Sequence, residues 1–301
     1  MSEKSPRISV VIGTYNQCDV IKKVLLEYNQ QSLDKAQFEV IVVDSMSTDG
    51  TEEMINSGDW AHQLVYIRQE NTGKAMARNR GVKAAKGRYI IISDADMIPH
   101  PEFVKTHLNA HLAQIEPLCF EGLTYDMSKL HWPINPALLT PYIKRNYQQG
   151  ASLGWFYFLT GNISFPKTLF EKEGGFSELF TGYGWEDLEL GYRFHKKKIK
   201  LRYLKSAINY HYHVISDTNE IERNVKKGLS AKVMLQLHPE LKWFLGLNPL
   251  SKVVYHLVPS NSFFYRYLKE KWYPLKGSLR YRFSRWFLKE HAYLSGILSK
   301  A

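Results

Sequence analysis

Cysteine is scarce in this chain, and long apolar runs are missing. The 301 residues include only two cysteines, Cys18 and Cys119. Two cysteines are too few for a disulfide framework and lack the spacing of a metal site, so we expect reduced thiols. No stretch approaches the roughly 18 apolar residues that a membrane span needs, and the opening "MSEKSPR" lacks the apolar core of a secretory signal. These features predict a cytoplasmic protein.

Acidic residues are few relative to basic ones. Forty Lys and Arg stand against 29 Asp and Glu, which gives a formal net charge of +11. Basic surface attracts phosphates, anionic lipids or nucleic acids, and charge alone does not choose among them. Lysine-rich runs such as "HKKKIK" have no recognised nucleic-acid-binding motif beside them. We therefore expect these runs to be solvated or to face phosphate, and we expect no nucleic-acid partner.

Four runs rich in β-branched residues mark the first hundred residues. They are "ISVVIG" from Ile8, "EVIVVD" from Glu39, "LVYIR" from Leu64 and "RYIIISD" from Arg88. Their apolar character is continuous rather than alternating, which favours strands covered on both faces. Helix-like segments separate them, and this alternation predicts an α/β fold with a parallel sheet. From about residue 118 to 182 the pattern indicates a mixed layer, and after His213 it is mainly helical.

Polar side chains stand where three of these runs end. Thr14 and Asn16 follow the first run, Asp44 closes the second, and Asp94 and Asp96 close the fourth. In parallel sheets, ligands bind beyond the carboxyl ends of the strands. Any one of these residues could be an ordinary loop residue, but three such strand ends together favour a ligand site.

The two carboxylates of Asp94-Ala95-Asp96 end a buried run. In an extended chain residues i and i+2 point to the same side, so Asp94 and Asp96 can face one ligand. Their mutual repulsion needs compensation, and a hard divalent cation such as Mn²⁺ or Mg²⁺ fits carboxylate oxygens. Such ions are usually shared with substrate phosphates. A solvated acidic turn is the alternative, and the position at the end of a buried strand favours the metal.

Four segments in a fixed order resemble one enzyme family. They are "VVIGTYN", "VIVVDSMSTDGT", "NTGKAMARNRGVKAAKGRYIIISDADM" and "GYGWEDLELGYR". Together they resemble the inverting nucleotide-sugar glycosyltransferases of family 2, which have the GT-A fold. The resemblance covers roughly residues 7–215, and the last segment is also similar to galactosyltransferase and chondroitin-polymerase-like enzymes. It implies a Rossmann-like, mostly parallel central sheet flanked by helices, with a helical carboxyl-terminal extension.

The resemblance assigns donor-side roles. The residues that it places around the nucleotide sugar are Thr14, Asn16, Asp44, Arg78 and Asp94. The first three lie near the base, Asp94 lies toward the ribose, and Asp96 binds the metal that grips the diphosphate. The family often has two adjacent acids after the second strand, whereas here Ser45 follows Asp44. A helix-surface ion pair is the alternative role for Arg78.

The resemblance also assigns an acceptor side around residues 183–187. The pattern "LELGYRF" predicts a helix, so Asp187 is expected near a helix N-terminus, where a carboxylate is stabilised in its ionised form. Simple helix capping is the other role open to it. The family's pattern makes one of the two acids the base, and we assign that role to Asp187 and acceptor binding to Glu186. Tyr183 and Trp185 can supply the apolar face on which a sugar ring stacks.

Two histidines are candidates for the metal sphere begun by Asp96. In "INYHYHV", His211 and His213 point to the same side if the segment is extended. A histidine completes the metal site in related enzymes, and the resemblance favours His211 over His213. A histidine packed in the core without a ligand is the other interpretation.

The carboxyl-terminal residues are basic and aromatic. We expect a catalytic domain over residues 1–235, with a nucleotide-sugar half to about 115 and an acceptor half from 116, and a helical extension over 236–301. One helical stripe near the end contains Leu279, Phe283, Trp286, Phe287, Leu294 and Ile297, with basic residues at its flanks. A basic amphipathic helix can lie at the inner face of an anionic membrane. Packing on the catalytic domain or on a partner subunit is the equal alternative.

These observations predict a metal-dependent, inverting glycosyltransferase. It would move a sugar from a nucleoside diphosphate donor, a UDP-sugar, to a hydroxyl of a glycan or lipid-linked acceptor in polysaccharide or glycoconjugate synthesis. A sugar-phosphate nucleotidyltransferase is an alternative, although "GTYNQCD" has only Gly13 where a glycine-rich basic loop is expected. A catalytically silent protein that binds a sugar nucleotide or glycan is the alternative from another class.

Overall fold

The chain forms two compact units. The computed structural model describes residues 5–127, 134–212 and 220–299. Unit 1 comprises residues 1–178 and 187–215, and unit 2 comprises residues 179–186 and 216–301. The chain therefore leaves unit 1 for one short segment and returns before it enters the helical region. The domain boundaries expected at about residues 115 and 235 remain a prediction, which this division into units does not test.

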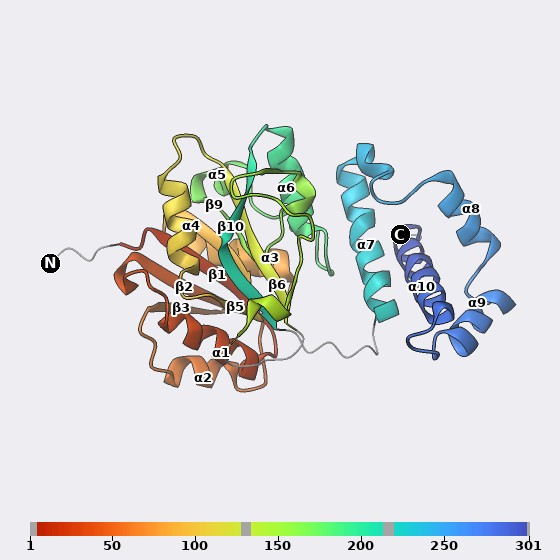
Figure 1. Cartoon of the computed structure of the whole chain (residues 1–301), viewed down its shortest axis with the longest axis horizontal. Helices are drawn as coiled ribbons and strands as arrows, with labels where there is room; N and C mark the ends of the chain where they lie inside the picture. Colours follow the sequence, from red (N-terminus) through yellow and green to blue (C-terminus); the bar gives the residue numbers. More distant parts are fainter. Residues whose placement is uncertain (1–4, 128–133, 213–219, 300–301) are drawn as a thin grey trace. The chain divides into compact units, whose positions relative to one another are not determined.

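Unit 1 is built on one mixed sheet (Figure 1). Its strands are β1 (Ile8–Thr14), β2 (Phe38–Asp44), β3 (Gln63–Arg68), β4 (Tyr89–Asp94), β5 (Met97–Pro99), β6 (Cys119–Met127), β7 (Thr140–Pro141), β8 (Ser152–Leu153), β9 (Ile163–Pro166) and β10 (Leu201–Tyr212). The order is β3-β2-β1-β4-β9-β6-β10-β5, with β7 beside β6 and β8 beside β10. Strands β3, β2, β1 and β4 are parallel, and antiparallel partners begin at β9.

Strands β1, β2 and β4 are covered on both faces, as their continuous apolar runs predict, whereas β3 at the edge of the sheet is only partly buried. Every residue of β2 is buried. On one face Val10 and Ile12 belong to a core with side chains from helices α1 and α4, among them Leu25 and Phe103. On the other face, helix α3 packs on β1 and β2. A buried sheet of this kind presents its chemistry at the strand ends rather than on its faces.

Six helices belong wholly or mainly to this unit. They are α1 (Cys18–Asn29), α2 (Thr51–Ser57), α3 (Lys74–Ala84), α4 (Phe103–Leu112), α5 (Lys167–Lys172) and α6 (Glu186–Lys196). The first three match the helix-like segments between the apolar runs. The mixed layer expected after residue 118 corresponds to β6 to β9, where short strands and single helical turns alternate.

Unit 2 is helical, as expected for the carboxyl-terminal region. It contains α7 (Glu220–Leu237), α8 (Pro249–Leu257), α9 (Phe263–Tyr267), a π-helical turn (Leu268–Trp272) and α10 (Leu279–Ile297). Helices α7 and α10 approach closely at two glycines: a Cβ on Gly228 would lie 2.1 Å from the Tyr293 carbonyl oxygen, and one on Gly296 would lie 2.3 Å from that of Val225. This backbone contact buries one part of α10.

The apolar stripe predicted on the last helix is divided by this packing. Phe287, Leu294 and Ile297 are buried, whereas Leu279, Phe283 and Trp286 are exposed. The carboxyl-terminal half of the stripe packs beside α7, and the amino-terminal half faces solvent. Contact of the exposed half with a membrane stays a prediction.

Candidate functional site

Three strand ends meet at one edge of the parallel sheet. Thr14 is paired with Asp44 in the β1–β2 register, and Gly13 is paired with Asp94 in the β1–β4 register. The residues predicted from the ends of separate apolar runs are thus brought together by neighbouring strands. Parallel strands place their carboxyl ends at the same edge of a sheet, which is the usual position of a nucleotide site.

Asp44 is the buried centre of a hydrogen-bond network. Its Oδ1 accepts hydrogen bonds from the backbone N–H of Ser47 at 3.1 Å and from the Ser47 hydroxyl at 2.5 Å. Its Oδ2 accepts from the hydroxyl of Tyr66 on β3 at 2.7 Å. Burial and this bond to Asp44 raise the pKa of Tyr66. Sequence reasoning identified Asp44 but missed both of its partners.

Thr14 and Asn16 have different roles at the end of β1. The Thr14 side chain is buried, and its hydroxyl has no hydrogen-bond partner among the described residues. Asn16 has φ +50°, and its Oδ1 accepts from the backbone N–H of Thr48 at 2.9 Å while its own N–H donates to the Ser47 hydroxyl at 2.8 Å. Asn16 therefore fixes the loop after β2, whereas Thr14 keeps polar capacity for a ligand.

Arg78 and Asp94 form a largely buried ion pair. Arg78 is 2% exposed, and its Nη2 donates to Asp94 Oδ1 at 2.9 Å. Lys74, one helical turn earlier on α3, places its Nζ 3.8 Å from the same oxygen. Burial alone would raise the pKa of Asp94, but Lys74, Arg78 and His211 outweigh it and lower the pKa to about 2. The spacing of Lys74 and Arg78 at i, i+4 is a signal from which Lys74 could have been predicted.

Asp96 lies beside His211, as the resemblance implies. The β5–β10 register pairs Met97 with His211, and His211 Nε2 lies 3.1 Å from Asp96 Oδ2. The Tyr142 hydroxyl contacts the other ring nitrogen, Nδ1, and so orients the imidazole. His213 lies outside the described residues, so the choice between the two histidines rests on His211 alone.

The donor set at Asp96 fits a divalent cation. Asp96 Oδ1 is buried and has no hydrogen-bond partner among the described residues, which is costly unless a ligand satisfies it. The described residues contain no group of three or more His, Cys, Asp or Glu side chains that could hold a metal by itself. Mg²⁺-type sites usually take one or two protein carboxylates and complete their sphere with water and substrate phosphate. Asp96 and His211 meet that requirement.

Asp187 stands at the start of helix α6, as predicted. It is the second residue of the helix, and its Oδ1 accepts from the backbone N–H of Leu188 at 2.8 Å. Arg193 anchors the helix in unit 1: it pairs with buried Glu189 at 2.8 Å and donates to the carbonyl oxygens of Glu173 and Gly175. Arg193, six residues after Asp187, thus ties the helix that carries Asp187 to the segment of residues 173–175.

A second buried carboxyl belongs to the surroundings of Asp187. Glu121 on β6 is 2% exposed, and its Oε2 accepts from the backbone N–H of Leu159 at 3.0 Å. Burial, together with the negative charge of Asp187, raises the pKa of Glu121 well above its ordinary value, despite that hydrogen bond. The sequence around Glu121, "CFEGL", reads as part of an apolar strand, so nothing in it marked this residue.

The residues predicted to bind the acceptor lie just before Asp187, in the segment of unit 2. Trp185 has φ +74° and its ring packs edge-on against Phe244 at a centroid distance of 6.2 Å. The Lys227 ammonium lies 5.6 Å from the same ring. Tyr183 is 49% exposed, and Glu186 is buried. Tyr183 is therefore the more exposed of the two predicted aromatic residues, and a role in sugar binding stays a prediction.

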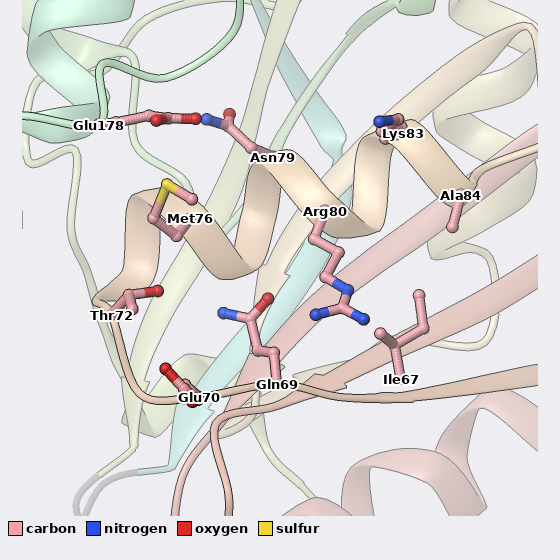
Figure 2. Close-up of a pocket in the computed structure, with 10 residues that line it drawn as sticks. All are labelled: Ile67, Gln69, Glu70, Thr72, Met76, Asn79, Arg80, Lys83, Ala84 and Glu178. Carbon is pink, nitrogen blue, oxygen red and sulfur yellow. The ribbon is translucent and has the colours of Figure 1, made fainter.

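A separate open groove lies between the end of β3 and helix α3 (Figure 2). Figure 2 shows Arg80 pointing from α3 toward Gln69 and Ile67, and Asn79 pointing toward Glu178. None of the residues predicted from the sequence lines this groove. Met76, Asn79 and Arg80 of α3 line the groove, whereas Arg78 on the same helix does not.

Comparison with known proteins decides the family. The model of glycosyl transferase family 2 matches residues 9–171, more than half of the chain. This chain belongs to glycosyl transferase family 2. A second model, described as the N-terminal domain of galactosyltransferase, matches residues 143–216 of this glycosyltransferase. The predicted family and its GT-A fold are confirmed.

Named relatives of this family 2 glycosyltransferase are larger proteins. Chondroitin synthase of Escherichia coli is 28% identical over 265 residues, which cover 77% of this chain and 38% of that protein. Validoxylamine A glucosyltransferase of Streptomyces hygroscopicus subsp. jinggangensis is 30% identical over 223 residues, 65% of this chain and 53% of that protein. The chain thus spans about half or less of the length of these relatives.

Solved structures share the fold of this glycosyltransferase. The mannosyltransferase PcManGT from Pyrobaculum calidifontis, in complex with GDP-Man and Mn²⁺, has a TM-score of 0.60 at 19% identity and covers 99% of this chain and 88% of its own. Staphylococcus aureus TarS 1–349, in complex with UDP-GlcNAc, has a TM-score of 0.58 at 17% identity, with 97% and 81% covered. No helix among the described residues is long and apolar enough to span a membrane.

Proposed function

We propose that this protein is a metal-dependent, inverting glycosyltransferase that moves a sugar from a UDP-sugar to a hydroxyl of a glycan or lipid-linked acceptor in polysaccharide or glycoconjugate synthesis. One observation carries the proposal: Asp96 offers a buried carboxylate oxygen that has no hydrogen-bond partner in the described part of the chain, at the sheet edge where Thr14, Asp44 and Asp94 meet. A family 2 chain with this donor set is equipped to hold a diphosphate through a cation.

Different donor residues are proposed to contact different parts of the nucleotide sugar. Thr14 and Asp44 face the base, and Asn16 holds the loop beside it in place. Asp94 binds the ribose, and Arg78 keeps that carboxylate charged and oriented through the 2.9 Å bond. Bound through Asp96 and His211, Mn²⁺ or Mg²⁺ would neutralise the charge that develops on the leaving diphosphate.

Asp187 is the proposed general base. It removes the proton of the acceptor hydroxyl while the acceptor oxygen bonds to the anomeric carbon of the donor. The bond from that carbon to the diphosphate oxygen breaks, and the nucleoside diphosphate leaves with the electron pair. Attack from the side opposite the leaving group inverts the anomeric centre. Tyr183, Trp185 and Glu186 precede the base in the chain and are proposed to bind the acceptor.

The donor is tested by nucleotide release from UDP-, GDP- and dTDP-sugars with Mn²⁺, first without acceptor and then with candidate glycans. We expect one donor class to respond, and we expect it to be a UDP-sugar. Structures that share the fold carry either UDP-GlcNAc or GDP-Man, so the base preference needs this panel. Binding without turnover of any donor would contradict the proposal, and so would pyrophosphate release from a nucleoside triphosphate and a sugar phosphate.

A further inference from the structure

Unit 2 exposes a connected series of aromatic rings, here called the aromatic ridge. Its members, from α9, the π-helical turn and α10, are Phe263, Tyr267, Trp272, Phe283 and Trp286. Consecutive ring centroids lie 6.0, 5.9, 6.0 and 6.0 Å apart. Phe263 is 78% exposed and Trp286 58% exposed, so the ends of the ridge are not shielded by the described residues.

Aliphatic side chains on the same helical segment are equally exposed. Leu250 and Leu257 on α8 and Leu279 at the start of α10 are each more than 70% exposed. Scattered apolar residues are normal on a protein surface, but a connected apolar surface marks an interaction site. The ridge is such a connected surface, and Leu279 begins α10, the helix that carries two of its rings, so a partner of the ridge meets aromatic and aliphatic side chains.

The charges around the ridge are mainly positive. Between residues 250 and 288 the chain contains one acidic residue, Glu270. The cations on the elements that form the ridge include Arg266, Lys269, Lys271, Lys276, Arg280 and Arg282. The Arg280 guanidinium lies over the Trp272 ring at 5.8 Å, so a cation stands directly beside a ring of the ridge. An anionic partner is the complement of this surface.

We propose that the aromatic ridge docks unit 2 on an anionic lipid membrane. Aromatic rings and leucines enter the headgroup region, where amphipathic rings are favoured, and the Lys and Arg side chains remain at the lipid phosphates. A second copy of the chain is a poor occupant, because two surfaces of the same positive sign repel each other. A soluble glycan fits less well, because sugars stack on rings but gain nothing from exposed leucines.

This surface extends the proposed function and rests on it for its purpose, which is to bring the enzyme to a lipid-linked acceptor. The docking itself is measured without donor or acceptor. A failure of vesicle binding would therefore leave the transferase proposal standing, and a failure of transfer would leave vesicle binding measurable.

The experiment is flotation of the full chain with vesicles of phosphatidylcholine, with and without phosphatidylglycerol, at low and at high salt. We expect binding only to the anionic vesicles and weaker binding at high salt. The double variant Phe263→Ser/Leu279→Ser should lose most of the binding. The matched control is Ile115→Ser/Leu138→Ser in unit 1, which replaces equally exposed apolar side chains and should bind like the native chain.

A charge series tests the basic part of the surface. Arg280→Gln and Lys276→Gln should each weaken binding about fivefold, the amount expected for one cation near an anionic surface. Lys205→Gln, an exposed cation in unit 1, should have no effect. All the substituted side chains are solvent-exposed, so we expect each variant to fold. Thermal unfolding followed by circular dichroism checks this.

Three results would overturn the proposal. The first is absence of binding to anionic vesicles by the native chain, or equal binding to neutral ones. The second is native-like binding by Phe263→Ser/Leu279→Ser. The third is that the ridge serves another partner. In that case the native chain forms a concentration-dependent dimer in sedimentation velocity or binds soluble dextran sulfate, the double variant does neither, and neither protein binds vesicles.

Discussion

Unit 1 contains two acidic residues, Asp94 and Glu121, whose neighbours carry opposite charges. Asp94 lies between Lys74 and Arg78, and these cations lower its pKa to about 2 despite its burial. Glu121 is buried near another carboxylate, Asp187, and its pKa is raised well above the ordinary value. The same chemical group is thus held charged in one place and pushed toward its neutral form in the other.

The difference shows that the neighbours of a buried carboxyl, rather than burial itself, set its charge. Lys74 and Arg78 on α3 keep Asp94 ionised over the whole physiological range, which suits the proposed binding of a metal and a ribose at this edge. The neighbour of buried Glu121 is a second carboxyl, Asp187, rather than a cation, so the pKa of Glu121 is raised. The following predictions test this contrast, from the largest expected effect to the smallest.

The largest effect is expected from loss of the metal ligand. Asp96→Ala, or chelation of the native chain with EDTA, should lower the transfer rate by about 10⁴-fold, because a cation contributes several kcal/mol to stabilisation of the leaving diphosphate. Steady-state transfer with Mn²⁺ restored after chelation measures this. Asp59→Ala, an exposed aspartate outside the site, is the control. Full activity of Asp96→Ala in EDTA would refute a metal role for this residue.

Removal of the base should cost less. Asp187→Asn keeps the shape of the side chain and removes the proton acceptor, which typically costs about 10³-fold in rate. UDP affinity, measured by calorimetry, should not change. Adjacent residues on a helix point about 100° apart, so Glu186→Gln should retain most of the rate. The opposite pattern in the two variants would assign the base to Glu186, and native rates in both would remove this site from the chemistry.

Loss of the cation at Asp94 should affect stability and donor binding together. Arg78→Gln removes the 2.9 Å partner of a largely buried carboxylate and leaves Lys74 at 3.8 Å. We expect the free energy of unfolding in urea to fall by about 2 kcal/mol, less than the 3–5 typical of a fully buried pair, because the Asp94 side chain is 25% exposed. UDP-sugar affinity should fall as well. Arg80→Gln, an exposed neighbour on α3, should change neither quantity.

The smallest effect is a change in the pH dependence of stability. Because the folded chain raises the pKa of Glu121, it binds a proton more tightly than the unfolded chain, and native stability falls as pH rises above about 4.5. Glu121→Gln removes this loss and can still accept from the Leu159 N–H. Its Tm should exceed the native Tm at pH 8, and the difference should vanish near pH 4.

A surface change provides the control for this pH series. Glu53→Gln lies in an exposed position of α2 and should give the native profile of Tm against pH. If Glu121→Gln also follows the native profile, Glu121 is charged in the folded chain, and the contrast between Asp94 and Glu121 is lost.

The parallel half of the fold and the donor edge were predictable from the sequence. Continuous apolar runs predict β1, β2 and β4, and their polar ends predict where Thr14, Asp44 and Asp94 meet, because parallel strands align their carboxyl ends. The partnership of Asp96 with His211 was implied by the resemblance. It depends on a register between β5 and β10 that no local pattern encodes.

What the sequence did not disclose depends on contacts between distant segments. Tyr66 reaches Asp44 only because β3 lies beside β2 in a particular register. Glu121 resembles any polar residue in a strand until α6 brings Asp187 near it. On α10 the apolar stripe was visible, but the sequence did not show that Phe287 would pack against Phe264 of α9 while Trp286 stays exposed.

The excursion of residues 179–186 into unit 2 determines how the protein can be shortened. A single cut after residue 215 keeps the whole sheet and every proposed donor residue. It also removes Phe244 and Lys227, the two side chains that pack on Trp185, and so leaves the excursion without its support. The two units are therefore not interchangeable modules joined end to end. Unit 2 contains residues from both sides of position 215, so a cut or a domain exchange at that position divides unit 2 into two pieces.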